Sequence, residues 1–202
     1  AITDPTIELG ADREQAARLA KALLAPFFLR MEPTGKLVSV RVPKTLGSFE
    51  RGFIKALAAT LQYVRGSGAS WTSDEFDATG EYRASYTLSG DRRICEKKRL
   101  RYTKVAAADG LLPVENLGRV SGGLSLRYDL LPGSDESARI EQISGQESLE
   151  VDPGAGMPQI RSQSEVSLRL LATVRIADAE ARALRAGEAD YEPILLGQQE
   201  LD

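Results

Sequence analysis

The residues of this chain that could do chemistry are its acidic and basic side chains and one thiol, because the 202-residue sequence contains no histidine. The missing histidine excludes Ser-His-Asp and Cys-His catalysis, histidine-ligated metals and an imidazole proton shuttle. An enzyme would have to use carboxylates, lysine, tyrosine or an unassisted cysteine, and no paired-carboxylate pattern supports such chemistry. We therefore predict a non-catalytic protein with no cofactor and no metal.

Cys95 is the only cysteine of the chain, so it cannot form an internal disulfide. Arg92, Arg93, Lys97 and Lys98 flank it and could lower the pKa of its thiol. The sequence offers no histidine that could serve as the base of a reactive-thiol site. We favour a strand cysteine that packs in the interior.

Two charged segments could each bind a partner. The basic run from Arg92 to Arg101 could face anionic lipid or an acidic protein, but we favour a solvated strand face that pairs with Glu81 across a hairpin. Asp74, Glu75 and Asp77 could bind calcium, but they lack the alternating oxygen ligands and glycine of a calcium loop. We interpret these acids as the charged start of a strand.

Composition narrows the class of protein. The chain has 26 basic and 29 acidic residues and a net charge of −3, which argues against nucleic acid as the main partner. Its length and its 42% hydrophobic content suit one domain. We divide it into an N-terminal helical segment (1–26), a helix-containing barrel (27–178) and a C-terminal tail (179–202). No apolar run is long enough for a transmembrane helix.

The apolar periodicity of the first half of the chain predicts one long helix. Apolar side chains recur every three or four residues from 46 to 64, which is one face of a helix: Leu46, Phe49, Phe53, Leu57, Leu61 and Val64. Further small or apolar residues lie off this face, so we expect protein on several sides of the helix. Another amphipathic helix is predicted at 12–25, and a short one at 178–186 followed by an exposed tail.

The rest of the chain alternates with the period of a β-strand. Strands are predicted at 27–31, 36–42, 81–89, 93–105, 120–130, 138–151 and 166–176, the last with the clearest alternation. Glu96 and Lys98 share a parity with the apolar Leu100 and Tyr102. Either that end of strand 93–105 leaves the core, or a bulge shifts the register.

Strands this long, connected by hairpins and apolar on one face, favour a barrel or a strongly curled sheet. The predicted fold class is α+β, mainly antiparallel β. We expect a barrel or strongly curled sheet around one long central helix, with an additional N-terminal helix.

Several short motifs occur in an order that resembles a known family. They are Val40-Arg-Val-Pro43, Arg51-Gly-Phe and Leu61-Gln62 in the helix, Glu75-Phe-Asp-Ala-Thr-Gly80, Tyr86, and Arg93-Ile-Cys-Glu-Lys-Lys-Arg-Leu100. This order resembles the N-terminal β-barrel of the large lipid transfer proteins (vitellogenin, microsomal triglyceride transfer protein and apolipoprotein B). The resemblance covers 38–105, about a third of the chain. The family has cysteines near the positions that Tyr82 and Tyr102 occupy here.

The resemblance implies a lipid-binding or lipid-transfer protein of an exported compartment, periplasmic or secreted. Attachment to a membrane through an N-terminal segment and a cytoplasmic location both stay open. The predicted lipid-binding residues are Phe53, Leu57, Leu61, Trp71, Tyr82, Tyr86, Leu126 and Tyr128. Trp71 could instead be a lid of the core.

The alternative is a protein–protein interaction or scaffold module that uses a filled barrel and binds no lipid. Such a module needs an exposed apolar patch or an edge strand. Lipid handling needs an open apolar cavity, so a helix packed tightly inside the barrel would argue for the alternative.

Overall fold

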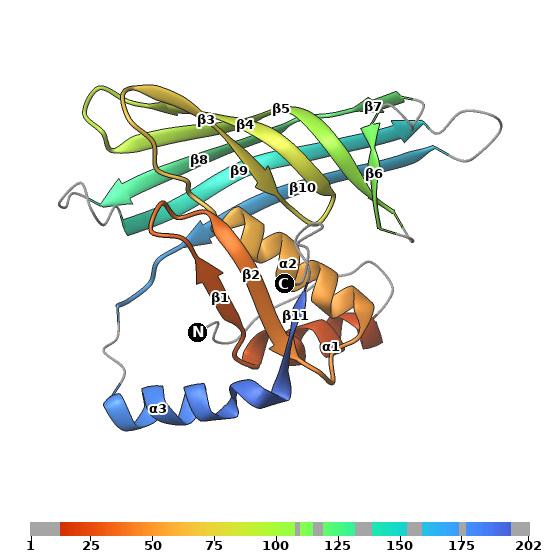
Figure 1. Ribbon diagram of the computed structural model, residues 1–202, viewed down its shortest axis with the longest axis vertical. Coiled ribbons are helices and arrows are strands. Elements are labelled where there is room, and N and C mark those ends of the chain that lie inside the picture. The colour runs from red at the N-terminus through yellow and green to blue at the C-terminus, as the bar shows by residue number, and fades with distance from the viewer. Residues whose placement is uncertain are drawn as a thin grey trace.

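The computed structural model describes residues 13–107, 110–114, 119–131, 139–152, 159–173 and 177–194. Within these residues the chain forms short helices and two antiparallel sheets (Figure 1). The helices are α1 (Arg13–Leu24), α2 (Ser48–Thr60), α3 (Asp178–Ala186) and a 3₁₀ turn, η2 (Gly187–Asp190). The expected N-terminal helix and the expected short helix near the C-terminus are therefore present.

The large sheet has eight strands. Its main path runs in the order β10-β9-β8-β5-β4-β3, while β6 pairs with β5 and β7 pairs with β9. The strands are β3 (Ser70–Phe76), β4 (Gly80–Leu88), β5 (Ile94–Ala107), β6 (Gly110–Pro113), β7 (Arg119–Ser121), β8 (Leu124–Leu131), β9 (Arg139–Asp152) and β10 (Ile160–Arg169). β3 was not expected from the sequence, because its run Ser-Trp-Thr-Ser-Asp-Glu-Phe has little apolar alternation.

The small sheet has three strands in the order β1-β2-β11, namely β1 (Phe28–Met31), β2 (Leu37–Pro43) and β11 (Tyr191–Ile194). β11 lies in the segment that was expected to be an exposed tail. It has only four residues and contains Pro193, which a strand tolerates at the edge of a sheet, where β11 lies. Residues 191–194 thus return to β2 as a third strand of the small sheet.

The expected barrel or strongly curled sheet around one long central helix is wrong. The large sheet is open, since none of the described strands joins β10 to β3. The helix expected to fill the barrel has 13 residues and lies between the large sheet and the small one (Figure 1). The helix ends at Thr60. The residues that follow pack on the concave face of the large sheet, where Tyr63 and Val64 are buried.

The buried face of α2 also differs from the expected one. Glu50, Ile54, Ala58 and Ala59 are its buried residues, whereas Phe49 and Phe53 are 39% and 40% exposed. Ile54 and Ala58 pack against α1 and β2 in one core, which also contains Leu19, Leu23, Leu37, Val40 and Val42. The other face of α2 points to the large sheet.

The question left open about strand 93–105 is answered by bulges. The pairing of β4 with β5 shifts register twice, between Glu81 and Tyr82 and between Arg83 and Ala84. Each extra residue in β5 reverses the side to which the following residues point. Lys97 and Arg99 precede both bulges in the chain and point inward, where they are buried. Leu100, the extra residue of the first bulge, is exposed.

The last strand of the sheet lies earlier in the chain than expected. β10 runs from Ile160 to Arg169, not from 166 to 176. Leu170 and Leu171 lie beyond it and are 42% and 87% exposed, and residues 174–176 are outside the described ranges.

The expected interruption of the strand before β10 at Gly145 is absent, since β9 continues through this residue. A Cβ there would lie 2.1 Å from the carbonyl oxygen of Ser125, so only glycine fits.

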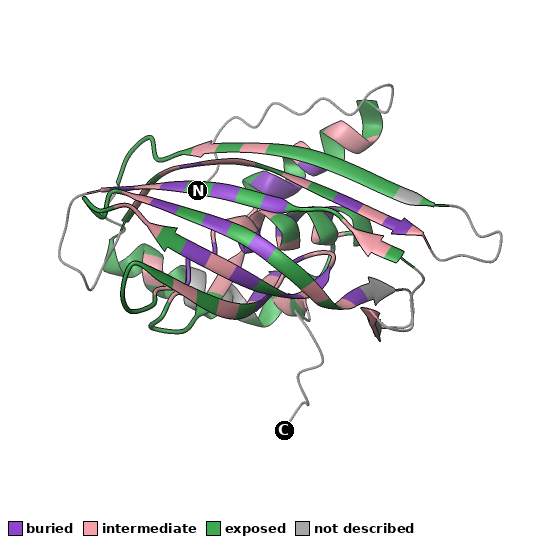
Figure 2. Ribbon diagram, turned by 90° about the horizontal axis from the view of Figure 1, so that it is seen from above, coloured by how far each residue is buried: buried purple, intermediate pink, exposed green. Residues whose placement is uncertain are grey.

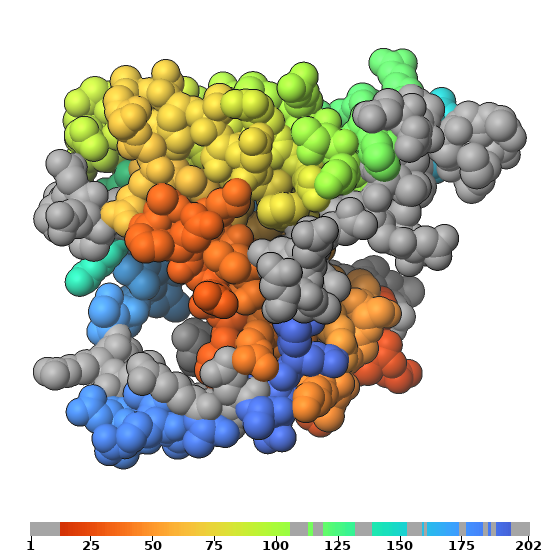
Figure 3. All heavy atoms as spheres, viewed as in Figure 1, coloured from red at the N-terminus to blue at the C-terminus, as the bar shows by residue number. Residues whose placement is uncertain are grey.

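The concave face of the large sheet carries the second core, formed by inward residues of β4, β5, β8 and β9 with Tyr63 and Val64. Figure 2 shows buried positions alternating along the central strands, whereas the edge strand β10 is almost entirely exposed. Figure 3 shows the first strands of the large sheet (yellow to green) above the β1–β2 hairpin (orange). The two cores therefore lie on opposite sides of α2.

Candidate functional site

A fully buried ion pair lies under the concave face. The Nζ atom of Lys97 on β5 is 2.6 Å from Oε2 of Glu75 on β3, and both side chains are 0% exposed. Lys97 also donates a hydrogen bond to the carbonyl oxygen of Gln62, at 3.3 Å. Burying two charges is costly unless the remaining hydrogen-bonding atoms are satisfied.

Neighbouring side chains satisfy Glu75. The hydroxyl of Tyr86 donates to Oε1 at 2.7 Å, and the side-chain amide of Gln62 donates to Oε2 at 2.6 Å. A weaker bond from the Tyr82 hydroxyl is 3.3 Å long. The side-chain oxygen of Gln62 accepts the backbone N–H of Leu37 at 2.7 Å, which ties the small sheet to the same network. The completeness of this network indicates a structural role.

The phenols of this region cannot act as bases. Burial, together with the negative charge of Glu75, raises the pKa values of Tyr82 and Tyr86 well above the ordinary range. Burial also raises the pKa of Tyr128. All three hydroxyls therefore stay protonated at neutral pH and act as hydrogen-bond donors.

A second ionic cluster lies beside the first. Nη1 of Arg99 is 3.3 Å from Asp77 and 2.6 Å from Glu147, and Nη2 donates to the carbonyl oxygen of Ser148 at 3.0 Å. The guanidinium carbon lies 4.1 Å from the centre of the Tyr102 ring. Since one cation faces two carboxylates, the three groups together carry an excess of one negative charge when both acids are ionised.

The carboxyl of Glu147 reflects this excess. Burial raises its pKa, and the charge of Asp77 adds to that effect, while its hydrogen bond from Arg99 opposes it. Asp77 is held in place by the backbone N–H groups of Thr79 and Gly80, at 2.7 and 2.9 Å. Glu147 is thus the more exposed acid of the cluster, and its carboxyl is protonated more easily than that of an ordinary glutamate.

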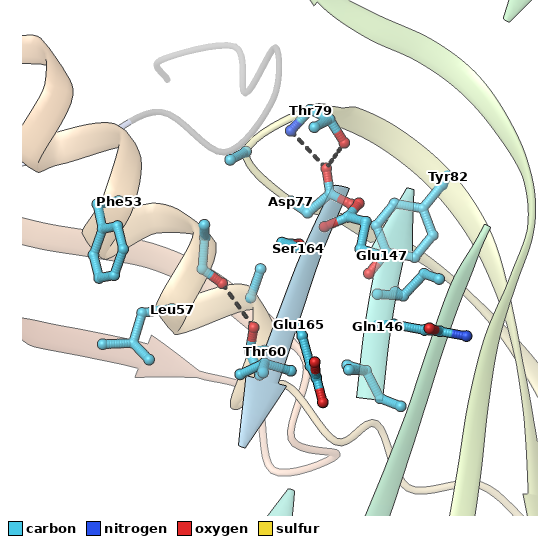
Figure 4. A pocket seen from close by; sticks show the side chains of 16 residues that line it. Phe53, Leu57, Thr60, Asp77, Thr79, Tyr82, Gln146, Glu147, Ser164 and Glu165 are labelled. Carbon is cyan, nitrogen blue, oxygen red and sulfur yellow. Dashed lines mark hydrogen bonds between the residues drawn. The ribbon is translucent and has the colours of Figure 1, made fainter. Parts of the chain in front are cut away.

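A pocket of about 190 Å³ lies between α2 and this second cluster. Figure 4 shows Phe53, Leu57 and Thr60 of α2 on one side, and Asp77, Tyr82 and Glu147 on the other, with Ser164 and Glu165 of β10 between them. The remaining lining residues are Ala56, Ala59, Ala78, Thr79, Leu124, Leu126, Gln146 and Val166. The lining is largely apolar, and three of its polar side chains, those of Asp77, Glu147 and Glu165, are acidic.

The predicted lipid-binding residues divide into two sets. Phe53, Leu57, Tyr82 and Leu126 line the pocket. Leu61, Trp71, Tyr86 and Tyr128 belong to the packed core of the concave face.

The second set fills space. Trp71 stacks on Tyr86 with ring centres 5.3 Å apart and donates its indole N–H to the carbonyl oxygen of Val64 at 2.8 Å. The Tyr128 hydroxyl donates to the carbonyl oxygens of Thr60 and Gln62 at 3.1 and 3.0 Å. These contacts match the core-lid alternative for Trp71.

The interpretations of the two charged segments need correction. The basic run is not one solvated face, because Lys97 and Arg99 are buried while Lys98 is exposed. Glu75 and Asp77 are also buried, as the partners of those two cations, and only Asp74 stays exposed. The matching spacing of Glu75-x-Asp77 and Lys97-x-Arg99 is the signal that could have revealed the two pairs.

Cys95 packs in the core, as expected. Burial raises the pKa of its thiol to about 11, so the reactive thiolate is scarce near neutral pH.

The structure gives no sign of a metal centre or a spanning helix in its described part. Across the described residues, no group of three or more acidic, cysteine or histidine side chains is placed to hold a metal ion. None of the described helices is long and apolar enough to cross a membrane.

The polar lining residues contributed by β9 and β10 were not predicted from the sequence. Glu147, Glu165 and Ser164 lie on strands whose alternation identifies faces but not the bulges and edges that bring particular residues to α2. A wider hollow of about 590 Å³ between α1 and the start of α2 contains none of the predicted site residues.

Comparison with known proteins gave no match, either to a protein-family model or to a curated protein. The resemblance to large lipid transfer proteins therefore stays a prediction.

Proposed function

We propose that this protein is a non-catalytic binding module that holds one hydrocarbon chain of an amphiphile in the pocket between α2 and the large sheet. The observation that carries the proposal is the amphipathic lining of that pocket. Phe53, Leu57 and Leu126 supply apolar lining, and Asp77 and Glu147 supply carboxylates among it. Apolar lining with a few placed polar groups is the usual composition of small-molecule sites.

The size of the pocket limits the ligand. Its volume of about 190 Å³ is below the roughly 300–1,000 Å³ of drug-sized sites. It is comparable with the roughly 150 Å³ cavity that accommodates a benzene ring. One end of a single chain fits this volume, and a cluster of neutral lipids does not.

The charged side chains at the pocket select the head group of the ligand. Asp77, Glu147 and Glu165 carry three negative charges when ionised, and Arg99 carries one positive charge beside them. An anionic head group would be repelled there, so we expect cationic or neutral head groups to bind more tightly. The family resemblance of residues 38–105 supports a lipid-like ligand in general but not this preference.

The experiment starts with native mass spectrometry of freshly purified protein and lipid analysis of the same sample. It continues with calorimetric titration of dodecyltrimethylammonium, dodecyl maltoside and dodecyl sulfate, each below its micelle concentration. We expect saturable one-to-one binding that is strongest for the cationic or neutral head group. No saturable binding of any of the three, together with an apo mass, would contradict the proposal.

A blocking variant shows whether this pocket is the site. Ala56 is an exposed residue of α2 that lines the pocket, so Ala56→Trp should obstruct it while leaving the buried face of the helix intact. Ala17→Trp, at an exposed position of α1, is the matched control. Binding should be lost in the first variant and kept in the second.

The interaction-module alternative has one specific observation in its favour. The aromatic residues Tyr63, Trp71, Tyr86 and Tyr128 fill much of the concave face, which leaves room for a ligand in only part of it. The titration separates the two functions, because an interaction module needs no amphiphile.

A further inference from the structure

β10 gives the large sheet a long, regular edge. It pairs with β9 over ten residues without a register shift, and none of the described strands pairs with its outer side. All residues from Arg161 to Glu165 are exposed. Such an edge presents unpaired backbone N–H and C=O groups to any other strand.

The charges of β10 alternate in sign at a spacing of four residues, with Arg161, Glu165 and Arg169. Charges of one sign would protect an edge, because identical strands would then repel each other. Alternating signs do the opposite when two identical strands pair antiparallel in a suitable register, since opposite charges directly across a pair are stabilising.

We infer that two copies of this chain pair through β10, antiparallel and centred on Gln163. In this register Arg161 of each copy lies opposite Glu165 of the other, so the ion pair forms twice. Ser162 lies opposite Ser164. Seven residues, 160–166, of each β10 take part.

Other registers fit less well. Centring on Glu165 would place that carboxylate against its own copy and Arg161 against Arg169, which is repulsive. Centring on Ser167 would match Glu165 with Arg169, but only five residues of β10, 165–169, would be paired. The Gln163 register is therefore the one with both charge matching and the longer overlap.

The arrangement has a consequence for the pocket. Antiparallel pairing across two edges continues the sheet, and the two-fold axis then stands perpendicular to it. Both pockets would open on the same face, each bordered by a strand of the shared pair, since Ser164, Glu165 and Val166 line the pocket. The pairing does not depend on the nature of the ligand.

Disulfide trapping tests the register. Gln163→Cys places two thiols directly opposite each other, with Cα atoms about 4.5–5.5 Å apart, within the range that a disulfide requires. We expect mild oxidation to give a covalent dimer of this variant, while the wild type, whose Cys95 is buried, stays uncrosslinked. Crosslinking of Ser167→Cys in place of Gln163→Cys would overturn the proposed register.

A charge swap tests the interface. Arg161→Glu and Glu165→Arg should each raise the dimer dissociation constant about tenfold by sedimentation, since each turns two attractive pairs repulsive. The double variant should recover most of the loss, although Arg161→Glu also removes the exposed ion pair that Arg161 makes with Glu150 of its own chain. The control is the swap Glu96→Lys with Lys98→Glu, an exposed pair on the central strand β5 that should change nothing. A wild type that is monomeric at all concentrations, or a double variant that does not recover, would overturn the proposal.

Discussion

The two halves of the concave face of the large sheet are occupied differently. On one half, the segment after α2 crosses the sheet, and Tyr63 packs against the rings of Trp71, Tyr86 and Tyr128. On the other half, α2 is the described helix that faces the sheet, and the pocket of about 190 Å³ lies between them. We call these the filled half and the hollow half.

The ionic clusters follow the same division. In the filled half, Glu75 and Lys97 balance each other and are completely buried. In the hollow half, Arg99 faces both Asp77 and Glu147, and Glu147 stays partly exposed at the pocket. The comparison teaches that one sheet face carries a balanced, fully buried ion pair beside an unbalanced cluster that borders a pocket, and we propose a structural role for the first and ligand binding for the second.

The largest effect should come from breaking the pair in the filled half. Lys97→Met leaves the carboxylate of Glu75 buried without its cation, so we expect a loss of about 3–5 kcal/mol in the free energy of unfolding. The double variant Glu75→Gln with Lys97→Met removes both charges and should recover much of that loss. Urea unfolding measures all three proteins, and equal losses in the single and double variants would contradict the pairing.

Two tyrosines that bind the same carboxylate sharpen the comparison. Tyr86 lies in the filled half and makes the 2.7 Å bond to Glu75, whereas Tyr82 makes a 3.3 Å bond and its ring borders the pocket. Tyr86→Phe should cost about 1.5–3 kcal/mol and Tyr82→Phe about 1 kcal/mol or less. Urea unfolding of both variants checks this order, and a larger cost for Tyr82→Phe would reverse our assignment of the two halves.

The pH dependence of stability should identify the hollow half. Burial raises the pKa of Glu147 above its ordinary value of 4.5. The stability that its protonated form contributes is therefore complete below pH 4.5 and is lost as the pH rises through the folded-state pKa. Glu147→Gln resembles the protonated acid at all pH values. The two unfolding free energies should therefore agree at acid pH, and the variant should become the more stable protein as the pH rises.

A matched acid controls for the loss of charge. Glu141 lies on the same strand and is exposed, so Glu141→Gln changes the net charge equally without touching the cluster. A Glu147→Gln curve that stays parallel to the wild type over the whole range would count against a strained carboxyl at the pocket.

The smallest effect concerns Cys95 in the filled half. With its pKa raised to about 11, the buried thiol should not react with a disulfide reagent in the folded protein near pH 8, and it should react fully in urea. The measurement is absorbance at the reagent's product band. Rapid labelling of the folded protein would mean that this part of the core opens.

The alternation of apolar residues predicted most strands, the hairpin and the possibility of a bulge, because strand periodicity is local. It could not reveal that Lys97 and Arg99 point inward. Their partners Glu75 and Asp77 come from β3 and its following turn, which are separated from β5 by β4.

Four of the predicted ligand residues line the pocket, but its acidic lining residues depend on where β9 and β10 meet α2. The extent of α2 was overestimated because Leu61 and Val64 fit the helical period although the chain leaves the helix at Thr60.

Methyl NMR of the leucine and valine side chains during titration with dodecyltrimethylammonium tests the central claim most directly. The account predicts shifts confined to methyl groups of the hollow half, namely those of Leu57, Leu124, Leu126 and Val166, with those of Val64 and Leu130 in the packed core unchanged. Shifts spread over both halves, or none at saturating concentrations, would contradict it.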